Sequence, residues 1–426
     1  MSQIRTIAVE DLRVGMYVQL DGGWLSHPFP LSAFKLGTAD EIRTIQRLGL
    51  KQVRWVPEKS DLEGEQAEAT APGSEPLAQA PASPEERAER ERQAWLADQR
   101  AAARRCEQQF GEAARAWREA WDGAGARPQD AGRTTTALAR AMLDKMLAAE
   151  DVGIRLVHGG GDRHAAHALN VAVIGMLIGR TLGMTDADMQ DLGVGALMHD
   201  IGKQDLPDRL RHHEDGFSAS ETAAYREHVS RGLLQGRRMF LAEGALTVVA
   251  QHHENADGSG FPQRIGSERM TLASRIVAIV NRYDNLCNPA TRAMALTPHE
   301  AVAMLFAQGR ARFDSAVLNA FIRMMGVYPA GSLVQLTDDR YGLVVGVNSS
   351  RPLKPRVLVH SPPKSRTASA DLQLMDLETL PDLGIRRSLP STKLPPAVLA
   401  ALDPRPRVTY YFEPLVRESA SEALAA

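Results

Sequence analysis

The sequence predicts a mainly α-helical fold, in which a helical bundle core carries a small N-terminal α/β module and a small C-terminal β appendage. Residues 134–327 contain successive apolar segments at helical spacing, separated by turns that contain Gly or Pro. Residues 1–60 and 328–426 instead carry short alternating or β-branched apolar runs. Residues 61–84 are rich in Ala, Pro, Glu, Gln and Ser, which predicts a disordered linker between the first module and the remainder.

Length and composition limit the classes of protein to consider. A chain of 426 residues is expected to form two to four domains. Its 50 basic and 52 acidic residues nearly cancel, so no net field favours a nucleic acid polymer or anionic lipid. Cys106 and Cys287 lie far apart in the sequence, which argues against a disulfide framework. Because the chain also shows no signal peptide and no apolar run long enough for a membrane span, we expect a cytoplasmic protein.

The N-terminal module, residues 1–60, combines strand and helix signals. Residues 7–20 and 52–56 carry alternating or β-branched apolar residues, whereas residues 38–48 resemble a short capped helix. A module of this size needs its large side chains for its own core. We therefore expect core positions, rather than a ligand surface, for its aromatic residues Trp24, His27 and Phe29.

Residues 85–125 predict a charged connecting helix. Glu and Arg recur at helical spacing and suit a solvated face. Phe110, Trp117 and Trp121 follow one another at intervals of seven and four residues, which places them in one apolar stripe. We expect this stripe to pack within the chain, and a homodimer formed through it is the alternative.

The central region, 130–327, is expected to be almost wholly helical. Its predicted helices are residues 134–149, 162–182, 186–198, 220–240, 245–253, 271–286, 298–308 and 313–325. In the C-terminal region the expected strands are residues 332–336, 341–348 and 356–360. The remaining sequence is rich in Pro and predicted to be loop-like as far as a short β-like run at 408–412.

Two pairs of polar residues end apolar helices in the central region. His199 and Asp200 end one predicted helix, and His252 and His253 end another. A buried imidazole or carboxylate is destabilising unless it is paired or bound to a metal. One such pair is equally consistent with a helix cap, but two together favour a metal site, because imidazole and carboxylate are common metal ligands.

The alternative is a helical bundle whose histidines only satisfy one another. It is less favoured because several apolar helices would each have to end in unpaired polar groups. His167 and His228 gain significance as candidate ligands only from the two pairs. The other histidines are expected not to bind metal: His158, His164, His212, His213, His299 and His360.

At these residues the sequence resembles a known family. Residues 150–326 are similar to an HD-GYP domain, a branch of the HD phosphohydrolase superfamily. The matching segments are His167, His199-Asp200-Ile201-Gly202-Lys203, His228, His252-His253-Glu254, Asp257-Gly258-Ser259-Gly260-Phe261-Pro262 and the segment 275–284. Residues 12–18 also resemble part of a small module of unknown role that often precedes such domains. The family hydrolyses the bacterial second messenger cyclic di-GMP to linear pGpG, and in many members to GMP.

The resemblance implies an HD-type helical bundle with two divalent metal ions, usually Fe or Mn. His167, His199 and Asp200 would bind the first ion, and Asp200 would bridge to the second. The second ion's further ligands would be His228, His252 and His253. Two metal ions can together activate a water molecule and clamp the oxygens of a phosphodiester. The resemblance assigns catalytic roles to Asp200 and Lys203, with Lys203 on the scissile phosphate. It assigns substrate binding to Lys203 and to the loop residues Asp257, Gly258, Gly260, Phe261 and Pro262.

The sequence departs from the family pattern at four places. Asn281 stands where the last metal ligand is usually Asp, and it is a weaker ligand without charge. Arg163 stands where members with three metals carry Glu, which argues for two metals. The substrate-holding segment Arg-Pro-Tyr-Arg is replaced by residues 290–293, where Arg292 is expected to compensate. Phe261 replaces a tyrosine and removes only a hydroxyl group.

The leading hypothesis is therefore a metal-dependent cyclic di-GMP phosphodiesterase. A degenerate domain that acts as a cyclic di-GMP receptor or signalling scaffold is the main alternative, motivated by Asn281. A hydrolase of the same superfamily that acts on another nucleotide is a third. Signalling proteins that dock on the Gly-Phe-Pro loop are a further expected class of partner.

Overall fold

The computed structural model describes residues 5–20, 33–48, 50–60, 83–159, 161–211, 216–348, 351–361 and 371–415. The chain divides into two compact units, Met1–Arg105 and Cys106–Ala426, and the division falls inside helix α2 (Pro84–Gly123). Helices predominate and small sheets lie towards the two ends of the chain, which confirms the predicted fold class. The predicted linker lies almost entirely outside the described residues. Within the described ranges, no helix has both the length and the apolar character needed to cross a bilayer.

The N-terminal module is a four-stranded antiparallel sheet with one helix. The strands run in the order β1-β4-β2-β3, and their bounds are Arg5–Ala8, Gln52–Trp55, Tyr17–Gln19 and Ala33–Lys35. Helix α1 (Ala39–Arg47) begins with a capping box between Thr38 and Glu41, which accounts for the predicted helix start. Its described core is mainly aliphatic, with Val18 and Ile45 fully buried. The predictions for Trp24, His27 and Phe29 fall outside the described residues.

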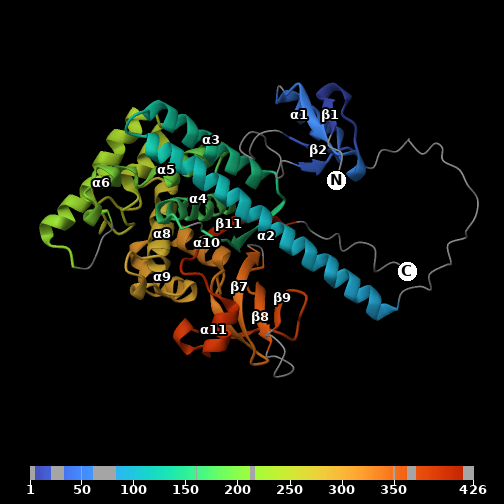
Figure 1. The fold of residues 1–426 in the computed structure, drawn as a ribbon. Coiled ribbons are helices and arrows are strands. Elements are labelled where there is room, and N and C mark those ends of the chain that lie inside the picture. The colour runs from blue at the N-terminus through green and yellow to red at the C-terminus, as the bar shows by residue number, and fades with distance from the viewer. Residues whose placement is uncertain are drawn as a thin grey trace, which may run out of the picture. The chain divides into compact units, whose positions relative to one another are not determined.

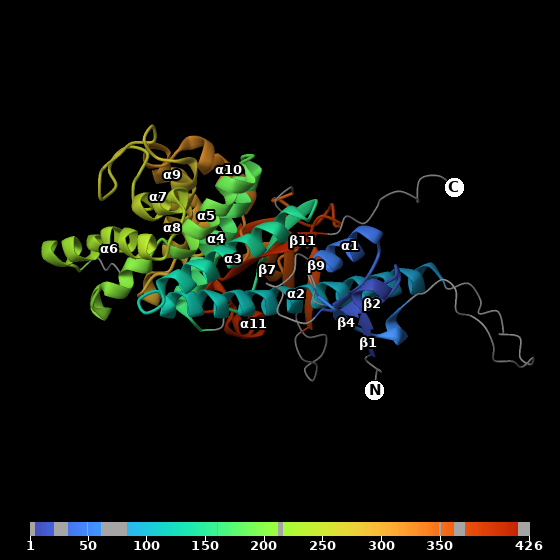
Figure 2. The same ribbon diagram turned by 90° about the horizontal axis from the view of Figure 1, so that it is seen from above.

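Helix α4 (Arg163–Thr181) lies at the centre of the helical bundle. It is buried on almost every side between Ala165 and Gly179, as expected of a helix that is apolar all round. Helices α5, α8 and α10 pack against it (Figure 1), and α3 and α7 pack against α5 (Figure 2). The helices that follow α2 are α3 (Pro128–Leu147), α5 (Asp186–Met198), α6 (Ala219–Arg238), α7 (Glu243–Gln251), α8 (Leu272–Cys287), α9 (Pro298–Arg312) and α10 (Ser315–Met325).

The aromatic stripe of α2 packs inside the second unit. Trp117 is 2% exposed, and its indole Nε1 donates a hydrogen bond to the Leu197 carbonyl at 2.8 Å. Its ring stacks on Trp121 with 4.8 Å between centroids. Phe110 meets Tyr411 edge to face at 6.3 Å. The stripe therefore packs within the chain, as expected.

A seven-stranded antiparallel sheet joins the C-terminal region to the strand that precedes α4. Strand β5 (Asp151–Leu156) was not expected from the sequence, and it pairs with both β7 and β11. The sheet order is β10-β6-β7-β5-β11, with β8 paired to β7 and β9 to β8. The strand bounds are β6 Leu333–Leu336, β7 Tyr341–Asn348, β8 Arg356–Ser361, β9 Asp371–Asp376, β10 Ile385–Ser388 and β11 Tyr410–Leu415.

The expectation of loop between residues 361 and 408 was wrong in part. Strands β9 and β10 and helix α11 (Pro396–Leu402) lie there. Strand β10 (Ile-Arg-Arg-Ser) has little apolar alternation to signal a strand, whereas the alternation of Leu372, Gln373 and Leu374 in β9 was a signal that sequence reasoning missed. They form because β8 and β6 offer them paired backbone partners.

A buried ion triad connects three strands of this sheet. Glu413 on β11 accepts hydrogen bonds from Arg155 on β5, with Nη2 to Oε1 at 2.7 Å, and from Arg356 on β8. The three side chains are each less than a tenth exposed. Burial alone would raise the pKa of Glu413, but Arg356 and Arg155 lower it below its usual value. The carboxylate therefore stays charged and couples β11 to the rest of the sheet.

We expect Glu413→Gln to lower the free energy of unfolding by about 3–5 kcal/mol, because two buried guanidinium groups lose their counter-charge. Urea denaturation followed by circular dichroism measures the change. Glu89→Gln, which breaks the exposed pair with Arg92, is the control and should leave stability almost unchanged.

The same pair of proteins tests the pH dependence. The pKa of Glu413 is lower in the folded than in the unfolded protein, so its stabilisation is complete above about pH 4.5 and is lost as pH falls towards the folded value. The stability difference between the wild type and Glu413→Gln should shrink below that pH. Equal denaturation midpoints at neutral pH would contradict the role of the triad.

Candidate metal centre

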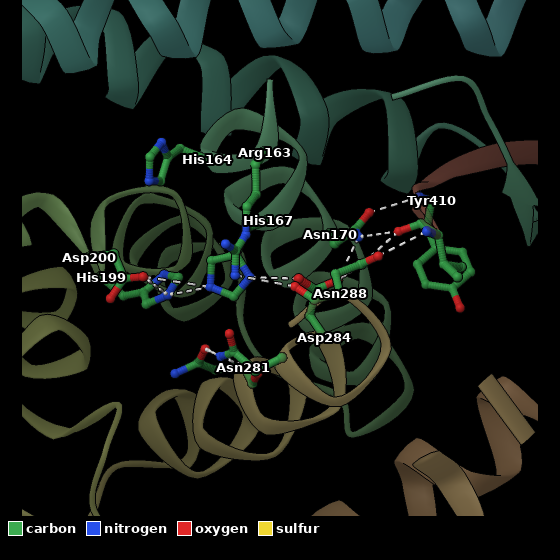
Figure 3. A network of polar contacts seen from close by, with 12 residues as sticks. Arg163, His164, His167, Asn170, His199, Asp200, Asn281, Asp284, Asn288 and Tyr410 are labelled. Atoms are coloured by element: carbon green, nitrogen blue, oxygen red, sulfur yellow. Dashed lines mark hydrogen bonds and ion pairs between the residues drawn. The ribbon is translucent and has the colours of Figure 1, made fainter. Parts of the chain in front are cut away.

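The ends of two apolar helices place the predicted ligands side by side. His199 and Asp200 directly follow α5, and His252 and His253 directly follow α7. His167 lies in the second turn of α4, and Figure 3 shows it facing His199 and Asp200. All of these lie in the second unit of the chain.

Gly202 allows helix α6 to approach the turn that follows Asp200. A Cβ atom added at Gly202 would lie 2.0 Å from the carbonyl oxygen of His228 and 2.3 Å from the Gly232 nitrogen, both on α6. Only glycine therefore fits where the turn after Asp200 crosses α6. This close crossing brings His228 to within reach of Asp200.

The Asp200 carboxylate lies between two groups of histidines. Its Oδ2 is 3.6 Å from His167 Nε2 and 3.4 Å from His199 Nε2. Its Oδ1 is 3.7 Å from the Nε2 atoms of both His228 and His252. Among the described residues, the candidate ligand atoms of Asp200, His228, His252 and His253 lie within 4.8 Å of one another, as do those of His167, His199 and Asp200.

The hydrogen bonds of the imidazoles determine which ring nitrogen carries the proton. Nδ1 of His199 donates to the Ala196 carbonyl at 2.8 Å. Nδ1 of His228 donates to the Tyr225 carbonyl at 2.6 Å, and Nδ1 of His252 to the Val249 carbonyl at 2.8 Å. A carbonyl oxygen can only accept, so each Nδ1 holds the hydrogen and each neutral ring presents a lone pair at Nε2.

These lone pairs point at one another in two places. The Nε2 atoms of His228 and His252 are 3.2 Å apart, and those of His167 and His199 are 3.1 Å apart. Neither pair has a proton to share while the rings are neutral, so the histidines do not satisfy one another. Burial lowers the pKa of His228 to about 4 and that of His252 well below the usual value, which keeps both rings neutral.

Among the candidate ligands, two further buried atoms have no hydrogen-bond partner in the described part of the chain, namely Asp200 Oδ1 and His253 Nε2. Convergent imidazole lone pairs and an unpaired carboxylate oxygen form a set of acceptors without a donor. A divalent cation satisfies such a set, and nitrogen and oxygen ligands without sulfur suit Fe, Mn or Zn. The residues present therefore fit a bound metal.

Asp284 orients His167, a role that sequence reasoning missed. Its Oδ2 accepts the Nδ1 hydrogen of His167 at 2.6 Å (Figure 3). Its Oδ1 accepts hydrogen bonds from the side-chain amides of Asn170 at 2.6 Å and Asn288 at 2.9 Å. A carboxylate behind an imidazole fixes the tautomer and raises the basicity of the free nitrogen. The available signal was Asn170, a single polar residue inside an apolar run.

Comparison with known proteins places this centre in a family. Residues 158–317 match the family model described as HD domain, and residues 4–133 match a domain of unknown function, DUF3391. Residues 158–317 form an HD domain. The resemblance predicted for the central region is thereby confirmed.

The HD domain has curated relatives. The chain is 28% identical over 386 residues to a cyclic di-GMP phosphodiesterase of Pseudomonas aeruginosa, covering 88% of this chain and 89% of that protein. It is 31% identical over 150 residues to the cyclic di-GMP phosphodiesterase response regulator RpfG of Xanthomonas campestris, covering 34% of this chain and 39% of that protein. A solved structure, Bd1817, a HDG"Y"P protein from Bdellovibrio bacteriovorus, aligns with a TM-score of 0.42 at 14% identity, over 75% of this chain and 98% of that one.

Lys203 adds a fixed positive charge to the HD domain's centre. Its Nζ donates to Asp200 Oδ2 at 2.6 Å and lies 5.5 Å from the centre of the Tyr225 ring. Burial alone would lower the pKa of Lys203, but the adjacent Asp200 carboxylate raises it. Lys203 and Asp200 line a small cavity together with His167, so this charge faces the space beside the candidate ligands.

The loop formed by residues 257–262 packs against the second group of histidines, which consists of His228, His252 and His253. The Phe261 ring stacks on His253, with 4.4 Å between centroids and 20° between planes. A Cβ at Gly260 would lie 2.4 Å from the Glu254 Cα, so this position also requires glycine. Asp257 and Pro262 are exposed, and Gly258 has a positive φ of 76°. The substrate-binding roles of these loop residues stay predictions.

Glu254 holds the loop in place, and sequence reasoning assigned it no role. It is fully buried, and its Oε1 accepts the backbone N–H of Gln263 at 2.6 Å. Its Oε2 accepts the backbone N–H of Ile265 at 3.2 Å. The side chain next to His253 therefore anchors the far end of the loop rather than joining the ligands.

Two further predicted site residues make contacts of other kinds. The Asn281 amide oxygen accepts a hydrogen bond from the Asn285 side chain at 2.6 Å, on its own helix (Figure 3). Arg292 is exposed in a short helical turn and lines a second cavity that does not include Asp200. Their roles stay predictions.

The histidines expected not to bind metal have other contacts where they are described. His158 Nδ1 contacts Glu107 at 2.5 Å, His164 stacks on Trp121 and His299 Nδ1 donates to the Val327 carbonyl. His360 lies on β8, within the sheet. His212 and His213 lie outside the described residues.

We expect Asp200→Asn to remove most of the metal bound by the purified protein, because this carboxylate faces both groups of histidines. Elemental analysis by mass spectrometry measures the metal content per chain. His299→Gln is the control and should leave the content unchanged. A variant Asp200→Asn with full metal content would contradict the proposed centre.

We expect Asp284→Asn to weaken metal binding by about 10- to 100-fold while leaving the candidate ligands intact, because the amide no longer holds the His167 tautomer. Competition with a chelator of known affinity measures this change. An affinity equal to that of the wild type would show that the orientation of His167 does not depend on Asp284.

Proposed function

We propose that the protein is a metal-dependent phosphodiesterase that hydrolyses cyclic di-GMP to pGpG, with GMP as a further product. The observation that carries the proposal is the Asp200 carboxylate, whose two oxygens face separate pairs of imidazole lone pairs. This arrangement supports a binuclear centre. The similarity to cyclic di-GMP phosphodiesterases over most of the chain supports the substrate.

The proposed ligands are divided between two ions, either Fe or Mn. His167, His199 and Asp200 would hold one ion, with Asn281 as the weakest predicted ligand of the set. Asp200, His228, His252 and His253 would hold the other. When bound, the ions would supply Lewis-acid activation of a water molecule and of the phosphoryl oxygens.

Lys203 is proposed to bind the scissile phosphate. Its ammonium group has three hydrogens, and Asp200 accepts one of them at 2.6 Å. The Tyr225 side chain is a second hydrogen-bond partner of this group, so one hydrogen remains for a phosphate oxygen in the cavity that Lys203 lines. The pair with Asp200 also holds the side chain in position before the substrate arrives, so less entropy is lost on binding.

We propose that the loop of residues 257–262 contacts the substrate on the side of the second group of histidines. Phe261 stacks on His253, and Arg226 lies 5.0 Å from the centre of the Phe261 ring. The exposed part of this loop is also the proposed docking site for signalling proteins. A flat ring beside the centre is suited to contact with a guanine base.

The second candidate function is a cyclic di-GMP receptor or signalling scaffold with little turnover. It is favoured by Asn281, because its neutral amide oxygen is already engaged by Asn285. Such a centre would bind the first ion more weakly than one with a carboxylate at this position.

Metal-loaded protein, with Fe under reducing conditions or with Mn, should convert cyclic di-GMP to pGpG. We expect Lys203→Met to lower kcat/KM by about 100-fold or more, since it removes a charge that faces the transition state. Lys393→Met, at an exposed residue of the C-terminal region, is the control. Product chromatography measures the rates.

A panel that includes 3'3'-cGAMP, the substrate named for relatives in Vibrio cholerae, tests the choice of nucleotide. No turnover with either metal would contradict the proposal.

Asn281→Asp separates the two candidate functions. A carboxylate can still accept the hydrogen bond from Asn285, so the local geometry should be kept. For a native enzyme we expect a change of less than about threefold in rate and no gain in metal content. A large gain in both rate and metal content would show that the metal centre of the natural protein is weakened. That result would favour the second candidate function, a cyclic di-GMP receptor. Rate and metal content are measured on the same preparation.

A further inference from the structure

The C-terminal segment before β11 is fixed directly beside the HD domain's centre. The Val408 carbonyl accepts hydrogen bonds from the side chains of Asn170 at 3.0 Å and Asn288 at 2.8 Å, and its N–H donates to Asn288 Oδ1 at 2.9 Å. The Tyr410 N–H donates to Asn170 Oδ1 at 2.7 Å. These are the same two asparagines that hold Asp284 behind His167 (Figure 3).

Arg407 precedes this anchored residue and faces the centre. It lines the small cavity that is also lined by Asp200, Lys203 and Arg163. The Arg407 side chain is exposed, and its hydrogen bond to the Gly161 carbonyl is long, at 3.5 Å. Over the described ranges, neither Arg407 nor Arg163 forms an ion pair within 4 Å.

The two arginines place like charges on one cavity wall. Arg163 is partly buried at the start of α4, and its one hydrogen bond, to the Asn288 carbonyl, is 3.4 Å long. Burial and the charge of Arg407 lower the pKa of Arg163, while Asp284 and Asp200 act in the opposite direction. Two guanidinium groups without a bound carboxylate are the arrangement that binds a phosphate group.

A larger cavity adjoins this one. It measures about 470 Å³, within the range of small-molecule sites. Both cavities share Arg407, Ala166 and Asn288 in their linings, so Arg407 stands where one meets the other. Arg292 and Arg405 also line the larger cavity, so its lining holds three arginines against one carboxylate, Asp162, although Arg405 lies 3.9 Å from Glu107. The smaller cavity measures only about 20 Å³, so the body of a dinucleotide would lie in the larger one, with a phosphate at the junction.

We propose that Arg407 and Arg163 bind the second, non-scissile phosphodiester of the cyclic dinucleotide, so that a segment from beyond the HD domain completes the substrate site. The inference rests on the proposed function, because it assigns the second phosphate of that substrate. The scissile phosphate lies at the histidine groups with Lys203. The guanidinium groups then hold the other phosphate at the junction of the two cavities.

Arg407→Gln tests the proposal in the full-length, metal-loaded protein. For cyclic di-GMP we expect KM, and Kd from calorimetry, to rise about 10-fold or more, because a charged hydrogen bond to phosphate is lost. The value of kcat should stay within about threefold. Bis(p-nitrophenyl) phosphate has a single phosphodiester, so its hydrolysis should be unchanged. Arg407→Lys should restore part of the affinity. Arg386→Gln, which disturbs an exposed pair with Asp339 on the same C-terminal region, is the control and should behave as the wild type.

The possible failures are distinguishable. If the wild type hydrolyses cyclic di-GMP and Arg407→Gln binds it with unchanged KM and Kd, this inference is wrong and the proposed function stands. A similar loss on both substrates would mean that Arg407 supports the fold, which also overturns it. If the wild type neither binds nor hydrolyses cyclic di-GMP, the proposed function fails and the inference fails with it.

Discussion

The centre of this protein depends on imidazole lone pairs that face one another without a proton between them. The backbone carbonyls of Ala196, Tyr225 and Val249 each accept the Nδ1 hydrogen of a histidine, so the Nε2 atoms are left to converge on Asp200. Inside a dry bundle such an arrangement is repulsive unless a cation lies within it. The helix ends therefore place the ligands. Their backbone carbonyls also determine which nitrogen of each imidazole carries a lone pair.

The surrounding packing serves this convergence. Because α4 is apolar on all sides, it can lie in the centre of the bundle and carry His167 and Asn170 to the same place as the ends of α5 and α7. Gly202 removes the one Cβ atom that would hold α6 away. Glu254 then ties down the loop that covers the second group of histidines. Each of these residues acts by position, and none needs to contact a substrate.

The C-terminal region is part of the same arrangement. Strand β11 pairs with β5, and the buried Glu413 connects both to β8. The sheet thereby fixes the segment that passes Asn170 and Asn288, and these side chains link it to Asp284 and so to His167. The sheet and the centre are thus connected by a short series of hydrogen bonds.

The sequence by itself determined the helices, the paired ligands at their ends and the loop glycines, because each leaves a local pattern of apolar spacing or a residue type that chemistry restricts. It also showed Asn281, but not that the Asn281 amide would bind Asn285. The tertiary structure alone decided the pairing of β5 with β11, the contact of Asp284 with His167 and the place of Arg407 in the cavity that Lys203 lines. These arrangements bring together residues more than a hundred positions apart in the sequence. A local sequence pattern contains no information about which distant residue will lie next to it in the fold.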